Sequence, residues 1–178
     1  MEKKKESKNF EKKKFNRPQK TLEEIVLDTK AVVKVTKGGR QRRFQAVVLV
    51  GDKKGLIGLG TGKANEVSEA VKKARQEAAK NVVRIPIVEG RTIPHEVTGV
   101  KGATRVIIKP AKAGTGLIAG GAVRSVLEIA GYHDVVSKSL GSRTKINMAR
   151  ATLKALTSMK TIEEVAAIRG KTKEEILG

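Results

Sequence analysis

Two β-rich runs, Phe44-Gln-Ala-Val-Val-Leu-Val50 and Leu56-Ile-Gly-Leu-Gly60, decide the fold of the first half of this chain. Gly51 and Asp52 bound the first run, and the glycines of the second permit another element to approach closely. The apolar period then becomes helical, with Asn65 placed to cap the helix and with apolar residues at Val67, Val71, Ala74 and Ala78. This change of period predicts a small sheet covered by one helix.

Upstream of these runs, Ala31-Val-Val-Lys-Val35 predicts another strand, which Gly38 and Gly39 interrupt. Residues 22–27 predict a short helical or extended entry to that strand. We therefore expect a β-β-β-α domain over residues 21–84, with the boundary to the next domain near residues 81–85.

A second cycle of elements begins near Arg84 and predicts a C-terminal α/β domain over residues 85–160, so the fold class is α+β. Its expected strands are 85–88, 95–100, 104–109 and 134–140. One expected helix ends at Gly131 and has an apolar face made of Val123, Val126, Leu127 and Ala130; a later one carries Ile146, Ala149, Leu153 and Leu156. Capping boxes at Thr161 and Thr172 predict two short helices over 161–178.

The charge of the chain points to an anionic partner. Its 178 residues include 38 Lys and Arg against 18 acids, which gives a net charge of +20. Three windows, 29–51, 97–127 and 135–162, each contain five or six basic residues and no acid. Such windows are typical of faces that contact phosphate, because solvated surfaces usually mix both signs. Residues 1–20 are rich in lysine and poor in apolar side chains, which predicts a disordered basic segment.

The strongest local signal is Lys37-Gly-Gly-Arg-Gln-Arg-Arg43, which lies between two predicted strands. Its four cations can contact phosphate oxygens, and its two glycines let the backbone approach a partner closely. Only 2% of the residues are aromatic, so stacking of bases on aromatic rings cannot be the main mode of binding.

Motifs for cofactors, metals and catalysis have little support in this sequence. Gly114-Thr-Gly-Leu-Ile-Ala119 has the form of a dinucleotide fingerprint, but the acid that would meet the ribose, Asp134, begins its strand instead of ending one. Residues 58–63 fail the Walker pattern, and Gly55-Leu-Ile-Gly58 lies between strand residues, unlike a KH loop. The only histidines, His95 and His133, have no clustered carboxylates. We expect no cofactor, no metal and no enzymatic activity.

Five short motifs lie along the chain: Lys-Gly-Gly-Arg at 37–40, Gly55-x-Ile-Gly58-x-Gly60, Gly114-Thr-Gly-Leu-Ile-Ala-Gly-Gly121, Asn147-Met-Ala-Arg-Ala-Thr152 and Ala166-Ala-Ile-Arg-Gly-Lys171. In order and in spacing over residues 22–178, they resemble the bacterial small-subunit ribosomal protein five family. The resemblance implies an N-terminal domain like a double-stranded-RNA-binding module and a C-terminal domain with a β-α-β element. It also implies binding to 16S-type ribosomal RNA, contacts with ribosomal proteins four and eight, and an influence on decoding accuracy.

The expected RNA contacts are the 37–43 loop and further basic residues, namely Lys34, Lys37, Gly38, Gly39, Arg40, Gln41, Arg42, Arg43, Lys53, Lys54, Lys63, Lys101, Lys112, Arg143 and Lys145. Arg124, Arg169 and Lys171 are the candidates for contact with partner proteins. We expect a cytoplasmic protein of the small ribosomal subunit that forms no homo-oligomer and binds neither membrane nor small-molecule substrate. A DNA-compacting protein and a cofactor-dependent enzyme are the alternatives.

Overall fold

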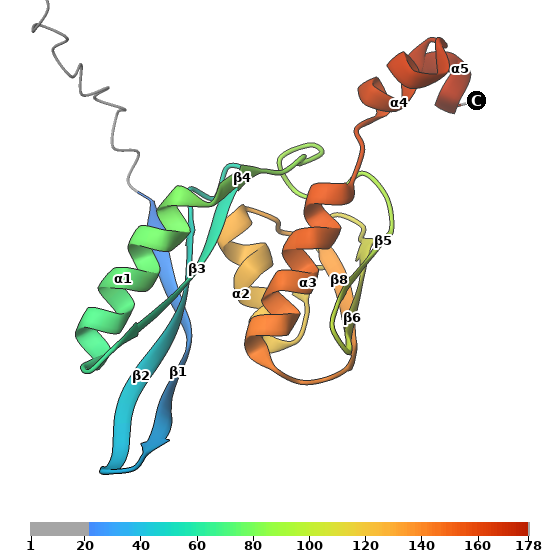
Figure 1. Cartoon of the computed structure of the whole chain (residues 1–178). Helices are drawn as coiled ribbons and strands as arrows, with labels where there is room; N and C mark the ends of the chain where they lie inside the picture. Colours follow the sequence, from blue (N-terminus) through green and yellow to red (C-terminus); the bar gives the residue numbers. More distant parts are fainter. Residues whose placement is uncertain (1–21, 178) are drawn as a thin grey trace, which may run out of the picture.

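The computed structural model describes residues 22–177, so the predicted basic segment 1–20 lies outside the described residues. The chain forms four layers, in the order helix α1, first sheet, helices α2 and α3, and second sheet (Figure 1). None of the helices in this part of the chain is both long and apolar enough to cross a membrane.

The first sheet has the order β1-β2-β3-β4, and all its strand pairs are antiparallel. Strand β1 (Glu23–Thr36) is continuous apart from a register shift between Val26 and Asp28, so the entry segment is extended and not helical. Strands β2 (Gly39–Gly51) and β3 (Leu56–Ala64) follow. The sequence predicted three strands here, whereas β4 (Val82–Arg84) pairs with β3 as a fourth.

Helix α1 (Val67–Lys80) packs closely on the first sheet because small residues meet on both sides. Its buried residues are Ala70, Ala74 and Ala78, and a Cβ added to Gly58, Gly60 or Gly62 of β3 would overlap their backbone carbonyl oxygens. The predicted apolar face of α1 was wrong at Val67, because that side chain is exposed. The predicted cap was also wrong, since the N-cap residue is Glu66, not Asn65.

The second sheet has the order β5-β6-β8-β7. Its strands are β5 (Val97–Lys101), β6 (Thr104–Pro110), β7 (Leu117–Ile118) and β8 (Val135–Gly141). Only β7 and β8 pair in parallel, and helix α2 (Gly121–Ala130) connects them, which makes a β-α-β element. The predicted strand at 85–88 is absent, since Val88 forms only an isolated bridge with Thr92.

The main core lies between the two sheets and draws on both. Leu49 and Ile57 of the first sheet belong to one buried cluster with residues of α2 and of α3 (Lys145–Ser158). The predicted α2 face is confirmed, because Val123, Val126, Leu127 and Ala130 are all buried. The two sheets thus share one core. The predicted domain limits at residues 84 and 160 stay predictions.

Helices α4 (Ile162–Arg169) and α5 (Lys173–Leu177) lie apart from both sheets and contact each other (Figure 1). Both predicted capping boxes form: Thr161 and Glu164 exchange hydrogen bonds between side chain and backbone, as do Thr172 and Glu175. Helix α4 buries none of its residues.

Candidate nucleic-acid interface

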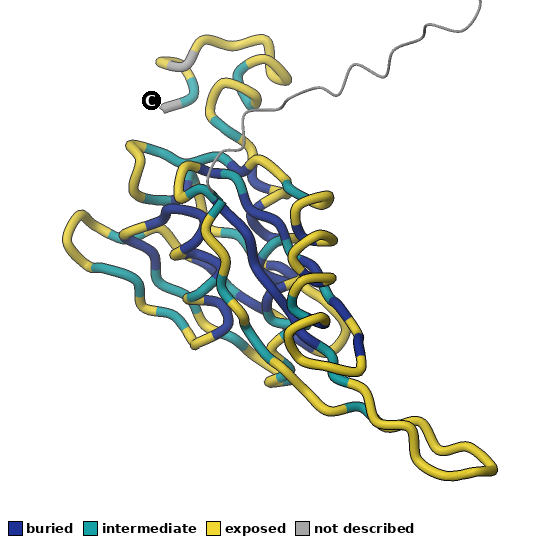
Figure 2. The backbone as a smooth tube through the Cα atoms, turned by 90° about the vertical axis from the view of Figure 1, so that its left-hand side faces the viewer, coloured by how far each residue is buried: buried dark blue, intermediate teal, exposed yellow. Residues whose placement is uncertain are grey.

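Residues 32–43 form a two-stranded projection, which we call the hairpin arm. Strands β1 and β2 pair as far as Thr36 and Gly39, whereas β3 pairs with β2 only from Phe44 onward. The arm therefore extends beyond the rest of the sheet, and all its residues except the partly buried Val32 are exposed (Figure 2). The sequence predicted a loop over 37–43, but only Lys37 and Gly38 form the turn, and Arg40, Gln41, Arg42 and Arg43 are strand residues.

The turn of the arm leaves its backbone open to a partner. A Cβ added at Gly38 or Gly39 would meet no atom within 4 Å. Gly39 has a φ of 140°, which side chains disfavour, and its carbonyl accepts a hydrogen bond from the Thr36 hydroxyl over 3.0 Å. The backbone conformation at position 39 thus favours glycine, whereas a side chain at position 38 would point into space that nothing in the described chain fills.

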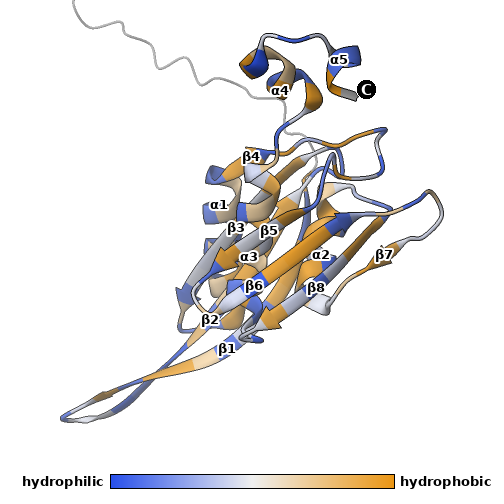
Figure 3. Ribbon diagram, turned by 90° about the vertical axis from the view of Figure 1, so that its right-hand side faces the viewer, coloured by the Kyte–Doolittle hydropathy of each residue, from blue (hydrophilic) through white to orange (hydrophobic). Residues whose placement is uncertain are grey.

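The two faces of the arm differ in chemistry, because residues directly opposite each other in a ladder share a face. Val33 lies opposite Arg42 and Val35 opposite Arg40, and these four residues, the valine–arginine face, line a hollow of about 370 Å³. On the other side Lys34 lies opposite Gln41, and these two residues line a second hollow with Val32, Val33, Arg43 and Lys63. We call Lys34, Gln41, Arg43 and Lys63 the lysine face. Figure 3 shows hydrophobic and hydrophilic residues running together along the arm.

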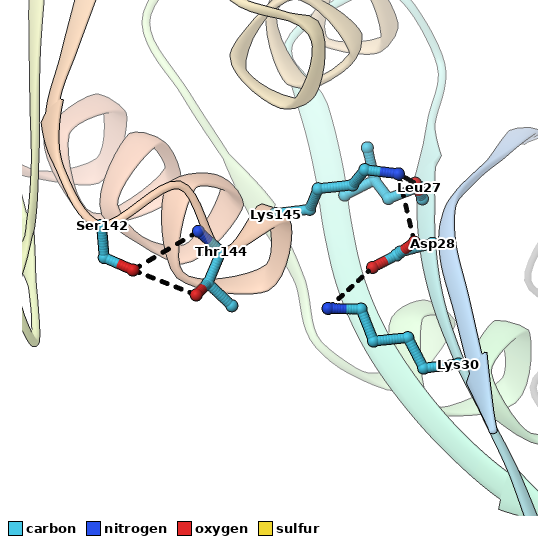
Figure 4. A network of polar contacts seen from close by, with 6 residues as sticks. All are labelled: Leu27, Asp28, Lys30, Ser142, Thr144 and Lys145. Atoms are coloured by element: carbon cyan, nitrogen blue, oxygen red, sulfur yellow. Dashed lines mark hydrogen bonds and ion pairs between the residues drawn. The ribbon is translucent and has the colours of Figure 1, made fainter. Parts of the chain in front are cut away.

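An ion pair between β1 and α3 joins the base of the arm to the second sheet's helices. The Lys145 ammonium lies 3.1 Å from Asp28 Oδ1, and the Lys30 ammonium lies 3.4 Å from Asp28 Oδ2 (Figure 4). Partial burial would raise the pKa of Asp28, but hydrogen bonds and charge from Lys145 and Lys30 outweigh it and hold that pKa below its usual value. One carboxylate thus holds two ammonium groups beside the arm.

Two further predicted RNA contacts lie at the same end of the second sheet as Lys145. Lys101 ends β5, and Arg143 precedes α3 in the loop after β8. The Ser142 N–H donates to the Ala103 carbonyl over 3.2 Å, so this loop and the β5–β6 turn are neighbours. The structure therefore brings Lys101, Arg143 and Lys145 to one end.

The predicted contacts Lys53, Lys54 and Lys112 lie elsewhere. Lys53 and Lys54 are in the β2–β3 turn, at the opposite end of β2 from the arm. The Lys53 ammonium lies 2.7 Å from Glu23 Oε2, and this contact raises the pKa of Lys53. Lys112 follows Pro110, which pairs with Val135 at the other end of β6 from Thr104. The β2–β3 turn with Lys53 and Lys54 lies away from the arm, and Lys112 lies at the other end of the second sheet from Lys101.

The candidates for protein contact are also separated. Arg124 is exposed on α2 and donates to the Leu117 carbonyl over 3.2 Å. It lines a hollow of about 620 Å³ together with Lys53, Glu128 and His133. Arg169 ends α4, and Lys171 follows it; both are exposed. These residues are accessible, and their role in partner contact stays a prediction.

The sequence did not single out three features of this interface. The strand at 31–35 was predicted without regard to its faces, yet Val33 is 52% exposed and Val35 is 74% exposed. The alternation of valine with lysine inside an acid-free window was the available signal. Asp28 and Lys30 were not candidates either, and no local signal pairs Asp28 with a lysine 117 positions away.

The glycine motif at 114–119 does not form a nucleotide site of the dinucleotide-fold type. Strand β7 separates Gly114 and Gly116 from the N-terminus of α2, so the glycine turn does not lead directly into the helix. Asp134 is buried and accepts a hydrogen bond from the Gly116 N–H over 2.9 Å, and it lies 2.9 Å from Arg91 Nη2. Within residues 22–177, no three His, Cys, Asp or Glu side chains are grouped so as to hold a metal.

Comparison with protein families matches both halves of the chain. The N-terminal domain of ribosomal protein S5 matches residues 22–86, which include the hairpin arm and the first sheet. The C-terminal domain of ribosomal protein S5 matches residues 99–169, from β5 to the end of α4. The chain therefore belongs to the ribosomal protein S5 family, whose members are structural, rRNA-binding components of the small ribosomal subunit.

Proposed function

We propose that this protein binds 16S-type ribosomal RNA chiefly through the hairpin arm and the adjoining end of the second sheet. The observation that carries the proposal is the arm itself, which projects from the sheet and has five cations and no acid. A two-stranded ribbon with no core of its own is marginally stable in water, so a partner is needed to order it. Phosphate is the partner that this charge favours.

The arm and the second sheet act together in this proposal. Asp28 ties Lys145 of α3 to β1, so Lys145 and its neighbour Arg143 are held near the base of the arm. Bound RNA would then bridge two parts of the protein that already share a core. This supports a role in assembling and stabilising the region between the body and the head of the subunit.

We also infer the finer roles that the family resemblance implies. These are an influence on decoding accuracy, contacts with ribosomal proteins four and eight, a cytoplasmic location and the lack of enzymatic activity. Exposed Arg124 on α2 supports a protein contact, as does α4, which buries none of its residues. Misincorporation by ribosomes reconstituted with and without the protein tests the first of these roles.

The test of RNA binding is the affinity for small-subunit rRNA across a salt series. If about 8 phosphates are engaged, log K falls against log[salt] with a slope of about −6 to −7. Lys34→Gln/Arg43→Gln should weaken binding and flatten the slope by up to about two units. The control Lys72→Gln/Lys80→Gln removes the same charge from exposed positions of α1 and should have a smaller effect.

Two results would contradict the proposal. A wild-type slope shallower than about −3 would mean that the acid-free windows do not contact phosphate. Equal affinity for rRNA and for duplex DNA of matched length would favour a DNA-compacting protein instead.

A further inference from the structure

The valine–arginine face of the arm combines exposed apolar side chains with cations that lack an acidic partner. Val33 and Val35 are exposed, although apolar side chains on a two-stranded ribbon gain nothing from a core there. The Arg40 and Arg42 guanidinium groups have no acidic partner among residues 22–177. Exposed apolar residues flanked by unpaired cations indicate a partner that is both anionic and partly apolar.

The pairing of β1 with β2 places the two valines and the two arginines side by side, where one planar ligand can contact both kinds of side chain. Each valine lies directly across the ladder from an arginine, Val33 from Arg42 and Val35 from Arg40. The hollow that the four residues line has a volume of about 370 Å³. A guanidinium plane can stack on a nucleobase, and valine methyl groups can contact the base or the ribose. Phosphate alone would make no use of the valines.

The lysine face has a different chemistry. Lys34, Gln41, Arg43 and Lys63 present charge and hydrogen-bond donors, and Lys30 lies farther along the same face toward Asp28. Such a set suits phosphate oxygens along a backbone, and Val32, which lies opposite Arg43 on this face, is partly buried. The two sides of one thin ribbon are therefore suited to two different parts of an RNA.

We propose that the hairpin arm is wedged between two RNA segments, with the lysine face on a phosphate backbone and the valine–arginine face on unpaired nucleotides. Unpaired nucleotides are favoured because the deep, narrow major groove of an A-form helix hides its base edges, whereas splayed bases can stack on arginine. A protein occupant is disfavoured, since it would have to neutralise cations on both faces. This inference rests on the proposed rRNA binding and assigns each face its own part of the RNA.

The decisive variant is Val33→Thr/Val35→Thr in the full chain. Threonine keeps the β-branched shape and the charge of the arm and replaces one apolar methyl group of each valine by a hydroxyl. The variant should bind small-subunit rRNA roughly tenfold more weakly with an unchanged salt slope, since lost apolar contact releases no counterions. Lys34→Gln/Arg43→Gln should also weaken binding, but it should flatten the salt slope because it removes two charges that contact phosphate. Far-UV CD and thermal unfolding should match wild type for both variants, because all four side chains are exposed.

Chemical probing of the RNA separates the two faces directly. Small subunits depleted of this protein are mixed with each variant and probed with a base-modifying reagent and with hydroxyl radicals. The valine variant should lose protection of unpaired bases and keep protection of the backbone, and the lysine-face variant should lose backbone protection.

The outcomes also separate this inference from the proposed function. Wild-type affinity and base protection in Val33→Thr/Val35→Thr, with salt-dependent binding intact, overturn the inference alone. If Val33→Thr/Val35→Thr keeps wild-type rRNA affinity and base protection but the reconstituted particle loses a small-subunit protein, the valines contact that protein. That result also overturns the inference. If the wild-type protein does not bind rRNA, both the proposed function and this inference are wrong.

Discussion

The backbone N–H of Lys53 donates a hydrogen bond to the carbonyl oxygen of Ile129 over 3.1 Å. Gly55 N–H donates likewise to the Ala130 carbonyl over 3.0 Å. The β2–β3 turn of the first sheet thus satisfies carbonyl groups at the C-terminus of α2, which would otherwise lack partners. Lys53 adopts a left-handed φ of 54° at this contact. The cap of one helix is therefore also the joint between the two sheets.

We expect Gly131→Ala to destabilise this joint. Gly131 has a φ of 95°, and a Cβ there would overlap the Lys53 carbonyl. The left-handed conformation alone costs a non-glycine residue about 1–2 kcal/mol, and the overlap adds to it. Denaturant unfolding should show a larger loss than Gly170→Ala, the matched control, whose φ is 63° but whose Cβ would meet nothing within 4 Å. Equal losses for the two variants would mean that the joint tolerates the methyl group.

Gly60→Ala tests the packing of α1 on the first sheet. The added methyl group would overlap the backbone of Ala74 and Ala78, so the helix has to move. Overpacking of this kind costs about 1–3 kcal/mol. Gly38→Ala is the control, since that position is open and lies in the turn of the arm. Calorimetric unfolding of both variants checks the expectation, and an unchanged midpoint for Gly60→Ala would contradict it.

Leu127→Ala and Arg124→Ala test the two sides of α2. Leu127 is fully buried in the core between the sheets, so its truncation should cost about 2–5 kcal/mol in the free energy of unfolding. Arg124 is exposed and makes one hydrogen bond, to the Leu117 carbonyl, so its truncation should be nearly neutral. The assignment of faces is wrong if urea titration ranks the two variants the other way round.

Asp134 predicts an acid dependence of stability. The Gly116 N–H and the Arg91 guanidinium outweigh the effect of burial and hold the pKa of Asp134 below its usual value of 3.8. A carboxyl whose pKa is lowered on folding stabilises the protein above its unfolded pKa and loses that contribution as pH falls through the folded pKa. The advantage of wild type over Asp134→Asn in thermal midpoint should therefore shrink as pH falls below about 4. A constant difference down to pH 2 would assign no stabilising role to the carboxylate charge.

Features set by neighbours in the sequence were predictable. The buried face of α2, its end at Gly131 and the capping boxes at Thr161 and Thr172 depend on spacing within a few residues, and the structure has each of them. The acid-free window that contains the arm is likewise a property of the sequence alone. Helical periodicity and caps act over one or two turns, so a sequence is enough to locate them.

Features set by distant pairing were not predictable. Val33 and Val35 have the pattern of a core strand and are exposed only because β3 stops pairing at Phe44, which leaves residues 32–43 without a third strand. The ion pair of Asp28 with Lys145 and the capping of α2 by Lys53 join segments that are far apart in sequence. The sequence therefore determined which residues carry charge and which helices form. Tertiary structure alone decided which cations share a face and which valines meet water, because exposure depends on what the rest of the chain packs against each strand.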